Sequence, residues 1–235
     1  MSRSTLRPSA LSRILPGGGP AGGKAGAVAP APAKKAPKDA AASAVVHKGA
    51  GEIRIIGGQW KRTRLSVARH PGLRPTPDRV RETLFNWLGQ DLTGWRCLDA
   101  FAGTGALGLE AASRGAAAVQ LVENDAALVA QLNTQQQRLK ATTVRVTRGD
   151  GLSALQQAGP GSLDLILLDP PFGSDIFGKA LQAAARAVAA DGHIYLEAPR
   201  VWVDEELADW GLVVHRHLKA GAVHAHLLRR GAVST

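Results

Sequence analysis

The sequence contains a single cysteine, Cys97, among its 235 residues. One cysteine excludes an internal disulfide framework and a cysteine-based zinc cluster, and it is typical of a chain kept in a reducing compartment. No stretch of about 18 apolar residues is present, so no membrane-spanning helix is predicted. We therefore expect a cytoplasmic, globular protein that does not use a membrane, built as one large domain or two small ones.

Acidic residues are scarce toward one end of the chain. The formal charge of the whole sequence is +10. Residues 1–50 hold eight basic side chains against one acidic one, and residues 51–82 hold eight against three. Residues 83–235 hold 13 basic and 15 acidic side chains. Basic charge gathered in the N-terminal third favours an anionic partner there, and nucleic acid is the commonest such partner.

Residues 1–50 also lack aromatic residues and are rich in Ala, Pro, Gly and Lys. Such a composition cannot bury enough apolar surface to offset the entropy of ordering, so we predict a disordered basic tail. The first 15 residues contain three Arg and four Ser but no acid, and they faintly resemble an organelle transit peptide. A plain N-terminal extension explains the same residues, and both readings stay open.

Residues 51–90 read as a small basic module. Ile53–Ile56 and Thr63–Val67 predict two short strands around Gly57 and Gly58, forming a β-ribbon. A helix is expected to follow, with Thr76 as its N-cap and Pro77 at its first position.

From residue 91 onward, apolar strands alternate with helical segments. The predicted strands are Cys97–Phe101, Val119–Glu123, Thr143–Arg148, Leu163–Asp169, His193–Glu197, Leu212–Leu218 and His224–Leu228, and the predicted helices are Ala106–Arg114, Ala126–Ala141, Ser153–Gln157 and Phe177–Ala190. This alternation indicates an α/β fold with a parallel sheet covered on both faces. The last two strands are joined by only three residues, too few for a parallel crossover, so they should pair antiparallel.

A glycine-rich loop follows the first of these strands. Gly103, Gly105 and Gly108 form a G-x-G-x-x-G pattern, and Glu123 ends the next strand, where a carboxylate can bind ribose hydroxyls. Dinucleotides and S-adenosylmethionine both suit this arrangement. Asp99, just before the glycines, would repel a pyrophosphate but suits a cationic amino-acid group. This carboxylate and the antiparallel C-terminal hairpin favour S-adenosylmethionine.

The predicted cofactor site extends along the edge of the sheet. Asp150 ends the third strand, where its carboxylate can accept a hydrogen bond from the adenine amino group. The candidate cofactor-binding residues are Asp99, Phe101, Gly103, Thr104, Gly105, Glu123, Asn124, Asp150 and Gly151.

A second loop, Asp169-Pro170-Pro171-Phe172, ends the fourth strand. The two prolines fix an extended loop and remove two N–H donors, so the loop exposes acceptors. Asp169 and the Pro170 carbonyl can accept both hydrogens of an exocyclic amino group and orient its nitrogen for attack on a methyl group. Asp169 can also take the released proton, and Phe172 can stack on the base. These four residues are the candidate catalytic residues.

These two loops resemble those of the class I S-adenosylmethionine-dependent amino-methyltransferases, which carry a [D/N/S]-P-P-[F/Y/W] motif. The segments that narrow the match are Arg54–Trp60, Arg74–Thr76, Asp78–Leu88 and Cys97–Ala111. Together they resemble the bacterial 16S ribosomal RNA guanine-N2 methyltransferase family, which modifies guanine 966. The resemblance implies a Rossmann-like fold with a seven-stranded sheet, S-adenosylmethionine as methyl donor, and a small-subunit particle containing 16S ribosomal RNA as substrate.

If the substrate is RNA, the basic module is its natural binding surface. The candidate RNA contacts are Arg54, Trp60, Lys61, Arg62, Arg64, Arg74, Thr76, Arg79 and Arg81. Arg79 and Arg81 are two residues apart and cannot share a helix face, so one of them can instead pair with an acid inside the protein. The predicted organisation is a tail over residues 1–50, an RNA-binding extension over 51–90 and a methyltransferase domain over 91–235.

Two other functions stay open on these residues. The Asp-Pro-Pro-Phe loop alone does not separate guanine N2 from adenine N6 of RNA or DNA. A non-catalytic RNA-binding assembly factor is disfavoured because Asp99, the glycines and Asp169 are all intact. We expect a monomer.

Several residues are expected to carry no chemistry. Cys97 should be a buried strand residue, and Trp202 and Trp210 should be packing residues. The pairs His215/His217 and His224/His226 allow a four-histidine metal site, but positions facing solvent or RNA explain them more simply, so no metal is expected.

Overall fold

The computed structural model describes residues 51–67, 75–172 and 175–231. They belong to one compact unit, Val46–Thr235. The predicted tail over residues 1–50 lies outside the described residues, as does Arg74. None of the helices in the described residues is both long and apolar enough to span a bilayer.

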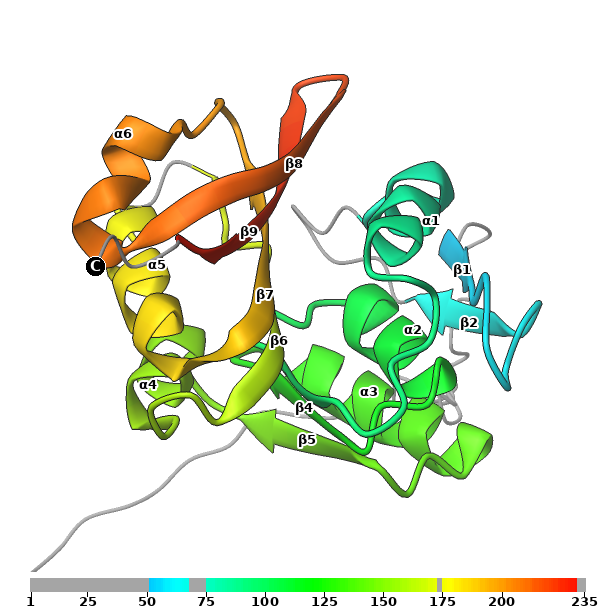
Figure 1. The fold of residues 1–235 in the computed structure, drawn as a ribbon. Coiled ribbons are helices and arrows are strands. Elements are labelled where there is room, and N and C mark those ends of the chain that lie inside the picture. The colour runs from blue at the N-terminus through cyan, green and yellow to red at the C-terminus, as the bar shows by residue number, and fades with distance from the viewer. Residues whose placement is uncertain (1–50, 68–74, 173–174, 232–235) are drawn as a thin grey trace, which may run out of the picture. The chain divides into compact units, whose positions relative to one another are not determined.

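A seven-stranded sheet forms the centre of this unit (Figure 1). Its strands are β3 (Arg96–Asp99), β4 (Ala118–Glu123), β5 (Val144–Arg148), β6 (Leu163–Leu168), β7 (Val188–Ala198), β8 (Leu212–Ala220) and β9 (Val223–Arg230). They lie in the order β5-β4-β3-β6-β7-β9-β8. The first five pair parallel, and β9 pairs antiparallel with both β7 and β8. The predicted sheet and its antiparallel C-terminal hairpin are confirmed.

Helices cover both faces of the sheet and close two apolar cores. Helices α2 (Ala106–Ser113) and α3 (Ala126–Leu139) enclose one core, and α4 (Gly151–Gln157), α5 (Phe177–Ala187) and α6 (Asp204–Leu207) enclose the other. The short α6 and the 3-10 turn after it were not predicted. Trp202 and Trp210 pack in the second core, as predicted. Cys97 is buried in β3, also as predicted.

The N-terminal ribbon and helix pack onto the α2 side of the sheet (Figure 1). Strands β1 (Gly51–Arg54) and β2 (Arg64–Val67) pair antiparallel, with Ile53 opposite Leu65. Both side chains are buried in the same core as Leu84 of α1 (Asp78–Trp87) and Leu109 of α2. The predicted ribbon and helix are confirmed, and they share their core with the sheet.

The start of α1 differs from the prediction. The N-cap is Pro77, in extended conformation and without a side-chain capping bond, and the helix begins at Asp78. The predicted cap, Thr76, is 5% exposed and its hydroxyl instead hydrogen-bonds Glu197 of β7. The hydroxyl of Thr76 therefore bonds a residue that is distant in the sequence instead of capping the first turn of α1.

Candidate active site

The two predicted loops lie at the topological switch point of the sheet, where the order of the strands changes direction. Strand β3 lies between β4 and β6, so the chain builds one half of the sheet outward from β3 and then returns to build the other half from β6. Asp99, at the end of β3, pairs with Leu167, near the end of β6. The loops after β3 and β6 therefore lie next to each other at the carboxyl edge, where sheets of this kind usually bind their ligands.

The glycines of the first loop have separate structural roles. Gly103 and Gly105 have φ angles of 50° and 79°, in the left-handed region that side chains disfavour. Gly105 is also the N-cap of α2. A Cβ on Gly108 would lie 2.1 Å from Leu121 Cδ2, so this glycine lets α2 pack closely on β4. The pattern thus fixes a tight turn followed by a close helix–sheet contact.

Asp99 is hydrogen-bonded to the glycine-rich segment that follows it. Its side chain is 2% exposed, and its Oδ2 accepts a hydrogen bond from the Gly108 N–H at 3.0 Å. Burial raises the pKa of Asp99 to about 7, and the charges of Glu123 and Glu197 act in the same direction. A positively charged group nearby would relieve this buried negative charge, which fits the predicted preference for a cationic ligand.

Glu123 links the end of β4 to the glycine loop. Its Oε2 accepts from the Gly103 N–H at 2.8 Å, and its Oε1 accepts from the Asp125 N–H at 2.9 Å. Asn124, the next residue, is exposed, whereas Thr104 in the loop is buried. The structure thus places Glu123 against the glycine loop.

The segment that follows β5 lies close to the glycine loop. Asp150 is exposed and N-caps α4, with its Oδ1 accepting from the Ser153 N–H at 2.7 Å. Hydrogen bonds from Ser153 lower the pKa of Asp150 below its usual value. A Cβ on Gly151 would lie 2.0 Å from the Ala100 carbonyl oxygen and 3.0 Å from the Phe101 ring. The start of α4 is therefore pressed against the glycine loop.

The Asp169–Phe172 loop follows β6 at the same edge of the sheet as the glycine loop. Asp169 is partly buried and Pro170 is buried, whereas Phe172 is 46% exposed. The Phe172 ring lies 6.5 Å from that of Phe177, at the start of α5. Burial raises the pKa of Asp169 well above its usual value, and the charges of Glu197 and Asp99 add to this effect.

Glu197 was not predicted as a site residue. It lies on β7, is 4% exposed and accepts a hydrogen bond from the Tyr195 hydroxyl at 2.9 Å. Burial raises the pKa of Glu197, while the hydrogen bonds from Thr76 and Tyr195 lower it. The sequence did contain a signal for it, because an acid near the carboxyl end of a parallel strand lies at the ligand-binding edge.

Most of the predicted RNA contacts lie on the surface of the ribbon and α1. The exposed ones are Arg54, Lys61, Arg62, Arg64 and Arg79. Trp60 is half-buried and packs against the core beside the ribbon.

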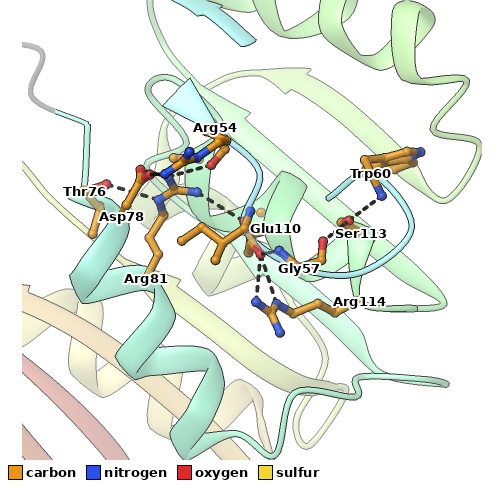
Figure 2. Close-up of polar contacts among 12 residues, drawn as sticks. Arg54, Gly57, Trp60, Thr76, Asp78, Arg81, Glu110, Ser113 and Arg114 are labelled. Atoms are coloured by element: carbon orange, nitrogen blue, oxygen red, sulfur yellow. Dashed lines mark hydrogen bonds and ion pairs between the residues drawn. The ribbon is translucent and has the colours of Figure 1, made fainter. Parts of the chain in front are cut away.

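Arg81 and Thr76 are the exceptions. Arg81 has no exposed surface, and Thr76 is 5% exposed. The Arg81 guanidinium lies 2.6 Å from Asp78 Oδ1 and 3.2 Å from Glu110 Oε2 (Figure 2). A phosphate cannot reach a guanidinium held in this way, so the predicted RNA contact is wrong for Arg81, and it is wrong for the buried Thr76 as well.

Glu110 of α2 bonds both the loop that follows β1 and Arg81 of α1 (Figure 2). Its fully buried carboxylate accepts hydrogen bonds from the Ile56 and Gly57 N–H groups at 2.9 and 2.7 Å. It also pairs with Arg81 and, at 2.9 Å, with Arg114. Because a buried carboxylate must be compensated, this network fixes the basic module to α2.

The histidines of the terminal hairpin contact one another. His217 Nε2 lies 3.0 Å from His224 Nδ1, and the rings of His217 and His226 are 4.8 Å apart. His226 has no exposed surface, and its Nε2 accepts from the Trp202 N–H, so the predicted solvent- or RNA-facing position is wrong for His226. Among residues 51–67, 75–172 and 175–231, no group of three or more His, Cys, Asp or Glu side chains is arranged to hold a metal ion.

The strand order and the two loops at the switch point define a Rossmann-like methyltransferase fold. The family described as "Conserved hypothetical protein 95" matches residues 53–229, and the chain belongs to this family. Ribosomal RNA small subunit methyltransferase D of Escherichia coli is 43% identical over 192 residues, which cover 79% of this chain and 94% of that protein. The protein of the same name in Haemophilus influenzae is 42% identical over 134 residues, 56% of this chain and 69% of that protein.

Solved structures agree with this assignment. The Escherichia coli protein yhhF matches with a TM-score of 0.66 and 38% identity, over 77% of this chain and 99% of that one. HI0767 of Haemophilus influenzae, which is named as a methylase, matches with a TM-score of 0.63 and 32% identity over the same shares of the two chains.

Proposed function

We propose that this protein is a cytoplasmic ribosomal RNA methyltransferase that acts as a monomer. It transfers a methyl group from S-adenosylmethionine to N2 of guanine 966 in 16S ribosomal RNA within a small-subunit particle. The observation that carries this proposal is the meeting of the Asp169–Phe172 loop with the glycine loop at the switch point. The names of the relatives support ribosomal RNA as the substrate.

The residues at the switch point fit S-adenosylmethionine, which supplies an electrophilic methyl group on a positively charged sulfur. The left-handed turn at Gly103 and Gly105 leaves the backbone open to a bulky ligand. Glu123 would bind the ribose hydroxyls, and Asp150 would accept from the adenine amino group. The buried carboxylate of Asp99 favours the cationic amino-acid end of the molecule. Phe101, Thr104, Asn124 and Gly151 would complete the pocket.

The Asp169–Phe172 loop would hold the target base. The lone pair of the guanine N2 is conjugated into the ring, so the nitrogen attacks only when it is well oriented. Asp169 and the Pro170 carbonyl would accept its two hydrogens and aim the lone pair at the methyl carbon. Asp169 would then take the proton released on methylation, while the exposed ring of Phe172 stacks on a base turned out of its helix.

The basic module would bind the surrounding RNA. Exposed Arg and Lys side chains of the ribbon and α1 would neutralise phosphates, as Arg54, Lys61, Arg62, Arg64 and Arg79 are placed to do. In this proposal residues 51–90 are the RNA-binding extension, and residues 91–235 are the methyltransferase domain.

Radiolabelled methyl transfer to undermethylated small subunits, followed by nucleoside analysis, tests the proposal. The expected product is N2-methylguanosine, formed faster on particles than on naked 16S RNA. Methyladenosine would overturn the guanine assignment and favour an adenine-N6 methyltransferase. No transfer to any RNA would favour a non-catalytic binding protein.

A further inference from the structure

Three acidic side chains lie on one face of the sheet at its carboxyl edge. In the register of the sheet, Asp99 pairs with Leu167 and Leu167 pairs with Tyr195. Leu168 pairs with Leu196, so the next residues, Asp169 and Glu197, lie side by side at the ends of β6 and β7. Because side chains alternate along a strand, Asp169 and Glu197 share the face of Leu167 and Tyr195, which pack in the first core.

The two neighbouring carboxylates differ in access. Asp169 retains exposed surface, whereas Glu197 is 4% exposed and cannot itself be reached by a base. Glu197 is held by two hydroxyl donors, Tyr195 on its own strand and Thr76 before α1. Hydroxyl donors favour the ionised form of a carboxylate, and here they partly offset the burial that raises the pKa of Glu197.

Other charged groups around this pair do not neutralise it. Asp99, from β3, adds negative charge, and Arg81 bonds the carbonyl of Thr76 but has its own charge paired with Asp78 and Glu110. On β9, the residue opposite Glu197 is Ala225. His226 packs toward the other face of the sheet, where it accepts from the Trp202 N–H.

We propose that Glu197 is a positioning residue for methyl transfer. This inference rests on the proposed function of Asp169 as proton acceptor. As the N2–carbon bond forms, the carbon–sulfur bond breaks with its electron pair left on sulfur, and one N2 proton passes to Asp169. A negative charge on Glu197, next to Asp169 in the register of the sheet, makes Asp169 a stronger acceptor for that proton and for the hydrogen bond that precedes it.

Glu197→Gln tests this role, because the amide keeps the size and an acceptor oxygen for Tyr195 but removes the charge. The acid limb of the kcat–pH profile should move to lower pH by about one unit, since Asp169 loses a neighbouring negative charge. The plateau of kcat should fall roughly tenfold because a weaker base accepts the proton, with KM for RNA nearly unchanged. An unmoved acid limb would overturn the proposal.

Three further variants separate the effect of the charge on Glu197 from a structural effect of its replacement. Glu197→Asp keeps the charge and should keep the acid limb in place. Tyr195→Phe, which removes one donor that favours ionised Glu197, should shift the limb in the same direction as Glu197→Gln but by less; it also serves if Glu197→Gln fails to fold. Glu206→Gln removes an exposed carboxylate of α6 and should leave the profile unchanged.

A measurement without turnover keeps this test distinct from that of the proposed function. The pKa of Asp169 can be followed by carbon NMR of its carboxyl group in the wild-type chain and in Glu197→Gln. A lower pKa in the variant supports the inference whichever base is methylated. An equal pKa in both chains refutes it, even if guanine N2 proves to be the target.

Discussion

At the scale of single residues, α1 contains two arginines, two positions apart, that differ in exposure and in their partners. Arg79 is exposed, whereas Arg81 has no exposed surface and is paired with Asp78 and Glu110. The sequence predicts that one of the two can be internal, because they cannot share a helix face. It does not predict which one, because the deciding partner, Glu110, lies 29 residues further along the chain.

Arg81→Ala should destabilise the protein by about 3–5 kcal/mol, because it leaves the buried carboxylate of Glu110 with less compensation. Arg79→Ala should change the free energy of unfolding by less than about 0.5 kcal/mol. The latter should instead weaken RNA binding and reduce the salt slope by about one. Urea melts and filter binding measure the two effects. Equal stability of the two variants would contradict the contacts seen here.

Asp169→Ala should lower kcat by about 10²- to 10⁴-fold, because it removes both an orienting acceptor and the proton acceptor. Its affinity for S-adenosylmethionine should stay within about twofold of the wild-type value. The matched variant, Asp150→Ala, should show the reverse pattern, with weaker cofactor binding and little change in kcat. Calorimetry and single-turnover assays separate the two. A large affinity loss in Asp169→Ala would place Asp169 in the cofactor site.

At the scale of elements, long segments with a clear hydrophobic period were predicted well. The strands of the sheet and helices α2 to α5 all appear, most with small shifts at their ends. The exception is β7, which begins at Val188, so residues 188–190, predicted as the end of a helix, belong to this strand. Helix α6 was missed because its four residues are too few to show a period, and three of them are acidic. The acidic first turn is itself favourable at a helix N-terminus.

Local sequence motifs identify the two candidate loops but not the residues that tertiary structure places beside them. The glycine loop and the Asp169–Phe172 loop follow from residues adjacent in sequence, and they do meet at one edge of the sheet. Glu197 carries no motif of its own, because its place beside Asp169 depends on the pairing of β6 with β7. The hydroxyl of Thr76 was assigned to a local cap for the same reason, since its partner is distant in the chain.

The close contact between Gly58, in the loop after β1, and the end of α2 leads to a prediction about the ribbon. Gly58 has a φ of 70°, and a Cβ there would lie 1.8 Å from the Ser113 carbonyl oxygen. Gly58→Ala should therefore displace the ribbon, with at least about 1–2 kcal/mol from the backbone conformation alone. Gly51→Ala, where a Cβ meets nothing within 4 Å, is the matched control. Thermal melts should separate the two variants, and equal melting temperatures would contradict this contact.

At the scale of the whole molecule, the charge is divided along the chain. Residues 1–50 carry eight basic side chains against one acid, and residues 51–82 carry eight against three. The exposed arginines of the second segment lie on the ribbon and α1, beside the core shared with the sheet. The charge that would position RNA is therefore attached to the methyltransferase fold itself.

Deleting residues 1–50 should weaken binding to small subunits at low salt while leaving kcat unchanged. The slope of log K against log salt should become shallower, by about 0.7–0.9 for each phosphate contact that is lost. A chain with residues 1–50 in scrambled order should bind like the wild type, because it keeps the same charge. Loss of kcat on deletion would show that the segment has a role beyond electrostatic attraction.

The reactivity of the Cys97 thiol can report how often the sheet around it opens. It lies on β3, paired with Val119 of β4 and Leu165 of β6, and it is 2% exposed. Burial raises the pKa of its thiol to about 12, so the folded chain offers alkylating reagents almost no thiolate. Since the sequence has no other cysteine, the alkylation rate of the unmodified chain measures how often the centre of the sheet opens. Any ligand that binds only the folded state should slow that alkylation in proportion to its occupancy.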